Sequence, residues 1–138
     1  MKFNFAAAGP WILRILAAVI LLQTLFFKFS GAKESVYIFT TVGMEPWGRI
    51  GSGIIELIAA VLILVPRTTA FGALMGAGLM AGAIFFHLTK LGLVVMDDGG
   101  QLFIYALLVF ISCIALLIIY RNDLLVTISR LFSKTSKK

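Results

Sequence analysis

Ionisable and polar side chains that interrupt long apolar stretches are the residues of this chain that could do chemistry. Glu56 and His87 can exchange protons, and His87 could pair with Glu56 or share its proton. An isolated charge in hydrocarbon is costly, so Glu56 is expected to have a partner, with Arg49 and Lys28 the nearest cations by depth. The candidates for ligand binding or proton handling are Glu56, His87, Arg49, Lys28, Gln23, Tyr105 and Gln101.

Three interpretations of this polar set stay open. A buried Glu–Arg or Glu–His pair can simply fix the register of two helices. The same groups can line a ligand pocket, or they can form a catalytic site, for which the sequence identifies no catalytic residue. No metal site is expected, because a metal needs about three ligands and only His87, Glu56 and the Asp97–Asp98 pair are available. Asp97 and Asp98 are instead expected to form a solvated turn.

The composition indicates that the elements positioning these residues lie in a membrane. Of the 138 residues, 61% are hydrophobic and 13% are charged, and the mean hydropathy is +1.07. These values exclude a disordered chain and argue against a water-soluble domain. The single cysteine, Cys113, excludes dithiol–disulfide chemistry and cysteine-bound zinc or iron–sulfur clusters. Because the net charge of +6 comes from residues that flank apolar segments, the expected partner is a lipid bilayer and not nucleic acid.

Four apolar segments have about the length of membrane-spanning helices, which need roughly 20 residues. The second and third are joined only by Pro66–Thr68 and should form a tight antiparallel hairpin. The sequence therefore predicts an all-α, integral membrane four-helix up-down bundle over residues 1–120, followed by a basic amphipathic tail helix within residues 121–138. The predicted spans are Trp11–Phe27, Ile50–Val65, Thr69–Leu88 and Gln101–Tyr120.

Alternating span directions should bring the polar candidates to one mouth of the bundle. The other ends of the spans carry only charges that are expected to snorkel toward water, such as Arg14, Arg67 and Arg121. Basic residues are more numerous on the side of the two termini, so both termini are expected to face the cytoplasm and the polar mouth to face outward across the inner membrane. The basic residues of the terminal side are Lys2, Arg14, Arg67, Arg121, Arg130, Lys134, Lys137 and Lys138.

Two segments outside the spans have patterns of their own. In the tail, Asp123–Phe132 places apolar residues at helical spacing, which predicts an amphipathic helix on the anionic cytoplasmic leaflet. Docking of this helix onto a partner protein is the alternative. The link Ser35–Met44 is apolar for a loop and is expected to lie at the membrane interface, with Trp47 as an anchor.

Small residues recur at four-residue spacing in the third span, which lets helix backbones approach closely in lipid. Packing within the bundle is the simpler explanation, and a homo-oligomer face is the alternative. The glycines concerned are Gly72, Gly76, Gly78 and Gly82.

Several short motifs resemble the DoxX family of small four-span membrane proteins. The resemblance covers roughly residues 14–120 and implies a four-helix bundle with a polar site at one mouth. A lysine that follows a Ser/Ala-Gly pair in the family corresponds to Lys33, so Lys28 and Lys33 are alternative pairing lysines. The motifs are Arg14, Phe27-Lys28-Phe29-Ser30-Gly31, Gly43-Met44-Glu45-Pro46, Gly53-Ile54-Ile55-Glu56-Leu57 and Ala81-Gly82-Ala83-Ile84-Phe85-Phe86-His87.

The resemblance implies two functions of different kinds. Some members of the family are small subunits that pass electrons to quinone, which suggests a redox-associated accessory subunit that binds a quinone or similar ligand near Glu56, His87 and Tyr105. No resident cofactor is expected, so electrons would come from a redox partner protein or a soluble substrate. Distant relatives assist assembly, which suggests a non-enzymatic scaffold or assembly factor instead. A transporter is a weaker hypothesis, because the inner half of the bundle lacks polar residues.

Overall fold

The computed structural model describes residues 5–136, which form helices and connecting turns without a strand. Lys2, Lys137 and Lys138, which contributed to the expected orientation, lie outside the described residues. The elements are α1 (Phe5–Phe29), α2 (Lys33–Thr41), α3 (Trp47–Leu64), α4 (Thr69–Phe86), a π-helical turn η1 (His87–Leu91), α5 (Gln101–Ile119) and α6 (Arg121–Thr135).

Four of the described helices are long and apolar enough to cross a membrane, as the sequence predicts. The first three extend two or three residues past a predicted bound, whereas the fourth begins at Gln101 as predicted and ends one residue earlier, at Ile119. The second span, for example, begins at Trp47 rather than Ile50. The candidate spans are Ala8–Phe29, Trp47–Leu64, Thr69–Leu91 and Gln101–Ile119.

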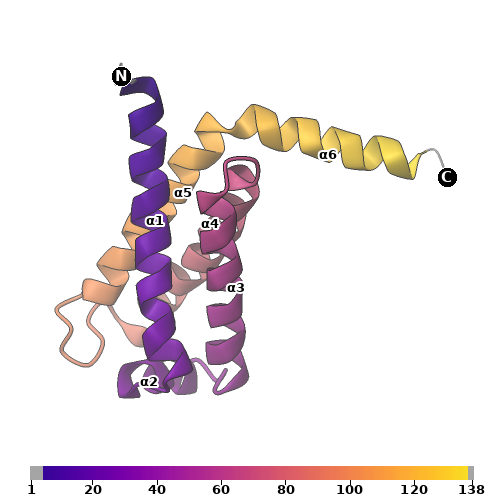
Figure 1. Ribbon diagram of the computed structural model, residues 1–138. Helices are drawn as coiled ribbons and strands as arrows, with labels where there is room; N and C mark the ends of the chain where they lie inside the picture. The colour runs from indigo at the N-terminus through magenta and orange to yellow at the C-terminus, as the bar shows by residue number, and fades with distance from the viewer. Residues whose placement is uncertain (1–4, 137–138) are drawn as a thin grey trace.

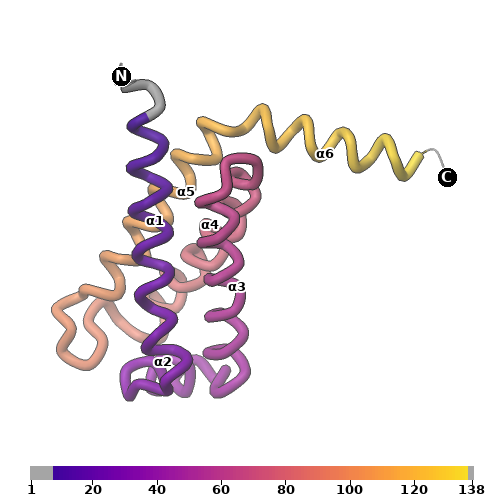
Figure 2. The backbone as a smooth tube through the Cα atoms, viewed as in Figure 1, coloured from indigo at the N-terminus to yellow at the C-terminus, as the bar shows by residue number. Residues whose placement is uncertain are grey.

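The four spans form a ring in which every helix packs against two others. α1 contacts α3 and α5, and α4 contacts the same two helices from the far side. Successive spans run in opposite directions, and α2 crosses one end of the bundle, the α2 end (Figures 1 and 2). At the other end, the α6 end, α1 begins and α5 passes into α6. The predicted up-down four-helix bundle is therefore confirmed.

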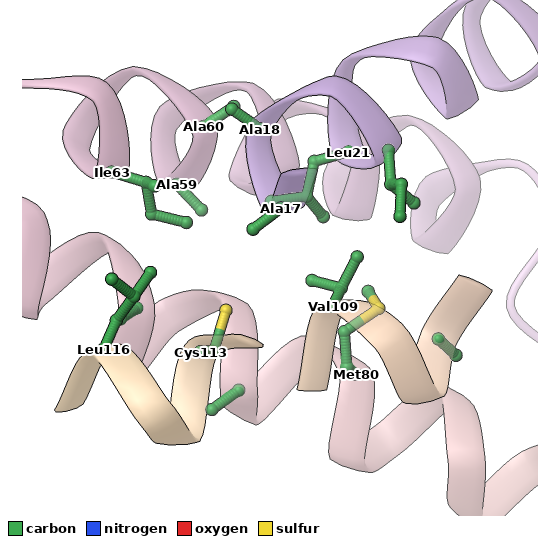
Figure 3. Close-up of a cluster of buried hydrophobic side chains, with 14 residues drawn as sticks. Ala17, Ala18, Leu21, Ala59, Ala60, Ile63, Met80, Val109, Cys113 and Leu116 are labelled. Atoms are coloured by element: carbon green, nitrogen blue, oxygen red, sulfur yellow. The ribbon is translucent and has the colours of Figure 1, made fainter. Parts of the chain in front are cut away.

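Small side chains fill the contacts between these helices. Ala17 of α1, Ala59 of α3, Ala73 of α4 and Cys113 of α5 are fully buried. Figure 3 shows Ala17 and Ala59 on one side of the core, with Cys113 on the other. Short side chains let the helix backbones approach closely, as is usual in lipid, and larger buried side chains such as Leu21, Ile63 and Leu116 fill the rest of the core.

The glycines of α4 divide into two groups. A Cβ atom added at Gly72 would lie 2.6 Å from the Ile63 backbone nitrogen, and one at Gly76 would lie 2.8 Å from the Cys113 sulfur. Gly78 and Gly82 have nothing within 4 Å of such a Cβ. Gly72 and Gly76 therefore allow close packing within the bundle. Gly78 and Gly82 make no such close contact.

Arg14 does not snorkel, and this part of the sequence prediction is wrong. Its side chain is buried, and it donates to the Ile63 carbonyl oxygen from Nε (2.8 Å) and to the Leu64 carbonyl oxygen from Nη2 (2.6 Å). The guanidinium also stacks over the Trp11 ring, 3.6 Å from its centroid. The cause lies in α3, whose last carbonyls lose their usual donors because Pro66 ends the helix.

The predicted interfacial link between the first two spans contains a short helix, α2. Gly31 (φ +69°) and Gly43 (φ +78°) adopt left-handed backbone conformations on either side of it, which glycine tolerates without strain. The chain can therefore turn sharply at the end of α1, cross the bundle as α2, and turn again before α3. As a result, α2 lies over the mouth where the polar candidates were expected.

The predicted tail helix is present and longer than expected, spanning Arg121–Thr135. It follows α5 directly after Tyr120, has no buried residue and runs across the bundle direction (Figure 1).

Candidate functional site

The best-defined polar site joins α1 to α3 through a buried ion pair. The Lys28 ammonium contacts Glu56 Oε1, and the Glu56 side chain is only 4% exposed, whereas Lys28 is 15% exposed. The Thr24 hydroxyl lies 2.8 Å from Glu56 Oε2 and also 2.8 Å from the Leu21 carbonyl oxygen, so its single proton is shared between these two acceptors. Both carboxylate oxygens therefore have a donor within reach.

Arg49 lies beside this ion pair, closer to the α2 end of the bundle. Its Nε lies 2.8 Å from Glu45 Oε1 and 3.1 Å from Oε2, and its Nη1 donates to the Lys28 carbonyl oxygen. Arg49 thus holds the last turn of α1 against the start of α3, where the carbonyls of α1 need donors. It pairs with Glu45 and leaves Glu56 to Lys28, which settles the pairing that the sequence left open between Arg49, Lys28 and Lys33.

We refer to Thr24, Lys28, Glu45, Arg49 and Glu56 as the Lys28–Glu56 cluster. Helix α2 lies against it, with the Phe39 ring centroid 5.8 Å from the Lys28 ammonium. Close packing requires glycine here: a Cβ at Gly53 would lie 2.9 Å from the Phe29 ring, and one at Gly48 would lie 3.3 Å from Phe39. Gly53 therefore lets the Phe29 ring of α1 pack against α3 about one helical turn before Glu56.

His87 is buried at the α2 end of the bundle, but in a separate hydrogen-bonded group. Its Nδ1 lies 2.9 Å from the Gly92 carbonyl oxygen, and because a carbonyl only accepts, Nδ1 carries a proton. The ring packs against Phe103, with centroids 5.5 Å apart. Within the described residues, His87 and Glu56 form neither a hydrogen bond nor an ion pair with each other. The imidazole and the carboxylate thus reach the same end of the bundle with different partners.

Asp98 organises the loop that follows His87. Its Oδ1 accepts from the backbone N–H groups of Val95 (3.0 Å) and Gly100 (2.8 Å), and its Oδ2 accepts from Leu102 (3.1 Å). Burial raises the pKa of Asp98, but these three donors and the nearby His87 outweigh it, so the pKa lies below its ordinary value. Asp98 therefore caps the start of α5, while Asp97 is exposed as expected for a solvated turn.

The remaining candidates lie outside the Lys28–Glu56 cluster. Gln23 is exposed on α1, and the exposed Gln101 donates from Nε2 to the Tyr105 hydroxyl at 2.6 Å. Thr24, which reaches Glu56 instead of Gln23, was missed by the sequence analysis. Its position one helical turn before Lys28 was the available signal, because residues at that spacing share a helix face.

The chemistry open to the cluster follows from its groups. Lys28 can donate hydrogen bonds to a carbonyl or an anion, and Glu56 can accept and return a proton. Among buried side-chain nitrogen and oxygen atoms of the described residues, none lacks a partner. A ligand would therefore have to exchange with an existing contact, and the partly exposed Lys28 ammonium is the group best placed to do so.

Comparison with known proteins agrees with this architecture. The profile of the DoxX-like family matches residues 12–115, a range that runs from α1 into α5 and includes the whole Lys28–Glu56 cluster. No curated protein and no solved structure matches the chain.

Proposed function

The chain belongs to the DoxX-like family of membrane proteins, and we propose that it is a redox-associated accessory subunit that binds a quinone or similar small ligand at the Lys28–Glu56 cluster. The observation that carries this proposal is the ion pair between two spans, with the carboxylate only 4% exposed. Ionisable groups at such depth are costly and are commonly found where ions, protons or ligands are handled.

The proposed chemistry uses the two charged groups differently. A quinone carbonyl would accept a hydrogen bond from the Lys28 ammonium, while Glu56 would exchange protons with the water at the α2 end. Reduction of a quinone to a quinol takes up two electrons and two protons. The protons would pass through this cluster, and the electrons would come from a redox partner protein or a soluble substrate.

We also propose an orientation in the inner membrane, with both termini in the cytoplasm. Of the twelve basic residues in the sequence, eight flank the span ends on the side of the two termini, and four flank the other ends, namely Lys28, Lys33, Arg49 and Lys90. Such an excess is typical of the cytoplasmic side. The Lys28–Glu56 cluster would then open to the outer side. A reporter domain that is active only in the cytoplasm, fused after Lys138, should be active. A reporter that is active only outside should be inactive there.

Ligand binding can be measured directly on the purified protein in lipid nanodiscs. A short-chain naphthoquinone should quench the fluorescence of Trp47, which lies at the start of α3 near the cluster. Replacing the charged pair by the neutral Lys28→Met/Glu56→Gln combination should weaken binding by roughly tenfold, since it removes one charge-assisted hydrogen bond.

The matched control is Asp97→Asn, which converts an exposed carboxylate at the same end to an amide. It should leave the binding constant unchanged. Equal quinone binding by the parent chain, the double variant and the control would refute a quinone site in the cluster, as would absence of binding in all three.

A non-enzymatic scaffold is the second candidate, and a different observation favours it. Gly78 and Gly82 lie on α4 with open space around them, so another helix could approach closely there. Gly78→Leu should then reduce cross-linking to a second copy or a partner helix. Gly51→Leu is the matched control, because Gly51 also has nothing within 4 Å but lies on α3. Equal cross-linking in both variants would remove the scaffold surface from α4.

A further inference from the structure

Helix α6 leaves the bundle without a partner for its apolar side. It begins directly after α5 and extends away from the spans (Figure 1). It contacts α4, but none of its residues is buried, and Leu125 and Phe132 are 62% and 73% exposed. A helix with such exposed apolar side chains needs an apolar environment outside the described chain.

The side chains of α6 divide into two faces. Leu124 and Leu131 lie four and three positions from Ile128, and Leu125 and Phe132 lie three and four positions from it, so all five share one side of the helix. Arg130 and Lys134, also one turn apart, lie away from this side together with Ser129 and Ser133, and the exposed Val126 is the apolar residue among them. The apolar face comprises Leu124, Leu125, Ile128, Leu131 and Phe132.

Charge is distributed unequally between the two ends of the bundle. Asp123 is the only acidic residue of α6, which also carries Arg121, Arg130 and Lys134. The other acidic residues of the chain, Glu34, Glu45, Glu56, Asp97 and Asp98, all belong to the α2 end. An anionic surface is therefore attracted to the α6 end and not to the opposite end.

The position of α6 relative to the spans indicates what covers its apolar face. Ile118 and Ile119, the last residues of α5, are 59% and 47% exposed on the outside of a membrane span. Since α6 follows after Tyr120 and turns across the bundle, its apolar face starts at the edge of the same hydrocarbon layer. Interfacial helices have this combination of an apolar face, basic residues and an in-plane direction.

We propose that α6 binds the anionic phospholipid surface at its end of the bundle. Its five apolar side chains insert into the boundary between headgroups and acyl chains, and Arg130 and Lys134 pair with anionic headgroups. This lipid surface is independent of the Lys28–Glu56 cluster, which lies at the opposite end.

The full chain in nanodiscs tests this proposal. An environment-sensitive fluorophore is attached at Ile128→Cys on the apolar face or at Ser129→Cys on the polar face, and bromine-labelled acyl chains serve as quenchers. The unsubstituted chain, whose Cys113 is fully buried, gives the labelling background. In phosphatidylglycerol-containing discs, quenching should be strong at position 128 and weak at position 129. In phosphatidylcholine alone, quenching at position 128 should fall.

Charge reversal separates lipid binding from simple burial. Arg130→Glu/Lys134→Glu should lower the ratio of bound to free α6 by roughly 25-fold or more in phosphatidylglycerol discs, since each lost cation contributes about a factor of five and the added acids contribute more. Lys33→Glu/Lys90→Glu makes the same charge change at the opposite end and should have no effect.

Equal quenching at positions 128 and 129, equal quenching in both lipids, or resistance to charge reversal would overturn the proposal. Burial that occurs only when a second protein is added would assign α6 to a protein partner instead.

Discussion

Replacing Lys28 by methionine should destabilise the bundle more than any other single change in the cluster. Methionine keeps most of the side-chain volume but removes the ammonium that neutralises Glu56. The carboxylate, only 4% exposed, keeps the Thr24 hydroxyl at 2.8 Å as its remaining donor. Removing one partner of a buried ion pair typically lowers the free energy of unfolding by about 3–5 kcal/mol, because the other charge stays buried and unpaired.

Replacing Glu56 instead of Lys28 should lower the free energy of unfolding by less, because the two side chains differ in exposure. In Glu56→Gln the Lys28 ammonium, whose side chain is 15% exposed, can turn toward water on its flexible stem. We expect a loss of about 1.5–3 kcal/mol for Glu56→Gln, the usual size for a lost charged hydrogen bond. The Lys28→Met/Glu56→Gln double variant should lose a similar amount, since neither charge then remains. The coupling free energy between the two sites is therefore expected to be about 3–5 kcal/mol, the same size as the loss for Lys28→Met alone.

Reversible unfolding by SDS in mixed bicelles, followed by far-UV circular dichroism, gives the four free energies of this double-mutant cycle. Additive losses in the double variant would contradict the pair as a direct contact. A greater loss for Glu56→Gln than for Lys28→Met would contradict the argument from exposure.

Three further predictions concern the stability of the bundle, the first two measured by the same SDS unfolding and the third by thermal melting. Gly72→Ala should lower the free energy of unfolding by about 1–3 kcal/mol through overpacking, whereas Gly78→Ala should leave it unchanged or raise it slightly. Equal effects of the two substitutions would show that α3 and α4 do not approach as closely as described. Arg14→Met should lower the free energy of unfolding by about 1–3 kcal/mol because a carbonyl of α3 loses its donor, while Arg67→Met should leave it nearly unchanged. An unchanged free energy of unfolding in Arg14→Met would mean that water or another donor caps α3. The folded pKa of Asp98 is lowered, so its stabilising contribution is complete above the unfolded value of 3.8 and is lost as the pH falls below 3.8 through the folded pKa. Thermal melting of Asp98→Asn should lack this acid-dependent step, and an unchanged step would assign it to another carboxylate.

Much of the fold could be predicted from the sequence alone. Apolar stretches of sufficient length must form helices in a bilayer, because only helices and closed barrels satisfy every backbone polar group there. The short Pro66–Thr68 link then makes α3 and α4 antiparallel neighbours, and alternation places Lys28, Glu56 and His87 at one end. The helical content of the link before α3 was not predicted, since the glycine turns at Gly31 and Gly43 become evident only with the chain path.

The candidate site was predicted less completely. Glu56 and Lys28 were both selected from their residue types, but the sequence could not decide whether Lys28, Lys33, Arg49 or His87 pairs with the carboxylate. Lys28 was decided by the rotation of α1 against α3, which the close contact at Gly53 helps to fix. The same rotation turns Thr24 toward Glu56 and leaves Gln23 exposed.

Sequence alone determined that this protein has four segments long and apolar enough to cross a membrane, and that Lys28, Glu56 and His87 belong to the same end of the bundle, because hydropathy and chain direction are local properties of each segment. Only the tertiary structure decided which charges meet. Arg14 shows why: a basic residue near the end of a span has the same local signature whether it reaches water or caps a neighbouring helix. Its role depends on a carbonyl of Ile63 and another of Leu64, far away in the sequence, whose own donors were lost where Pro66 ends α3.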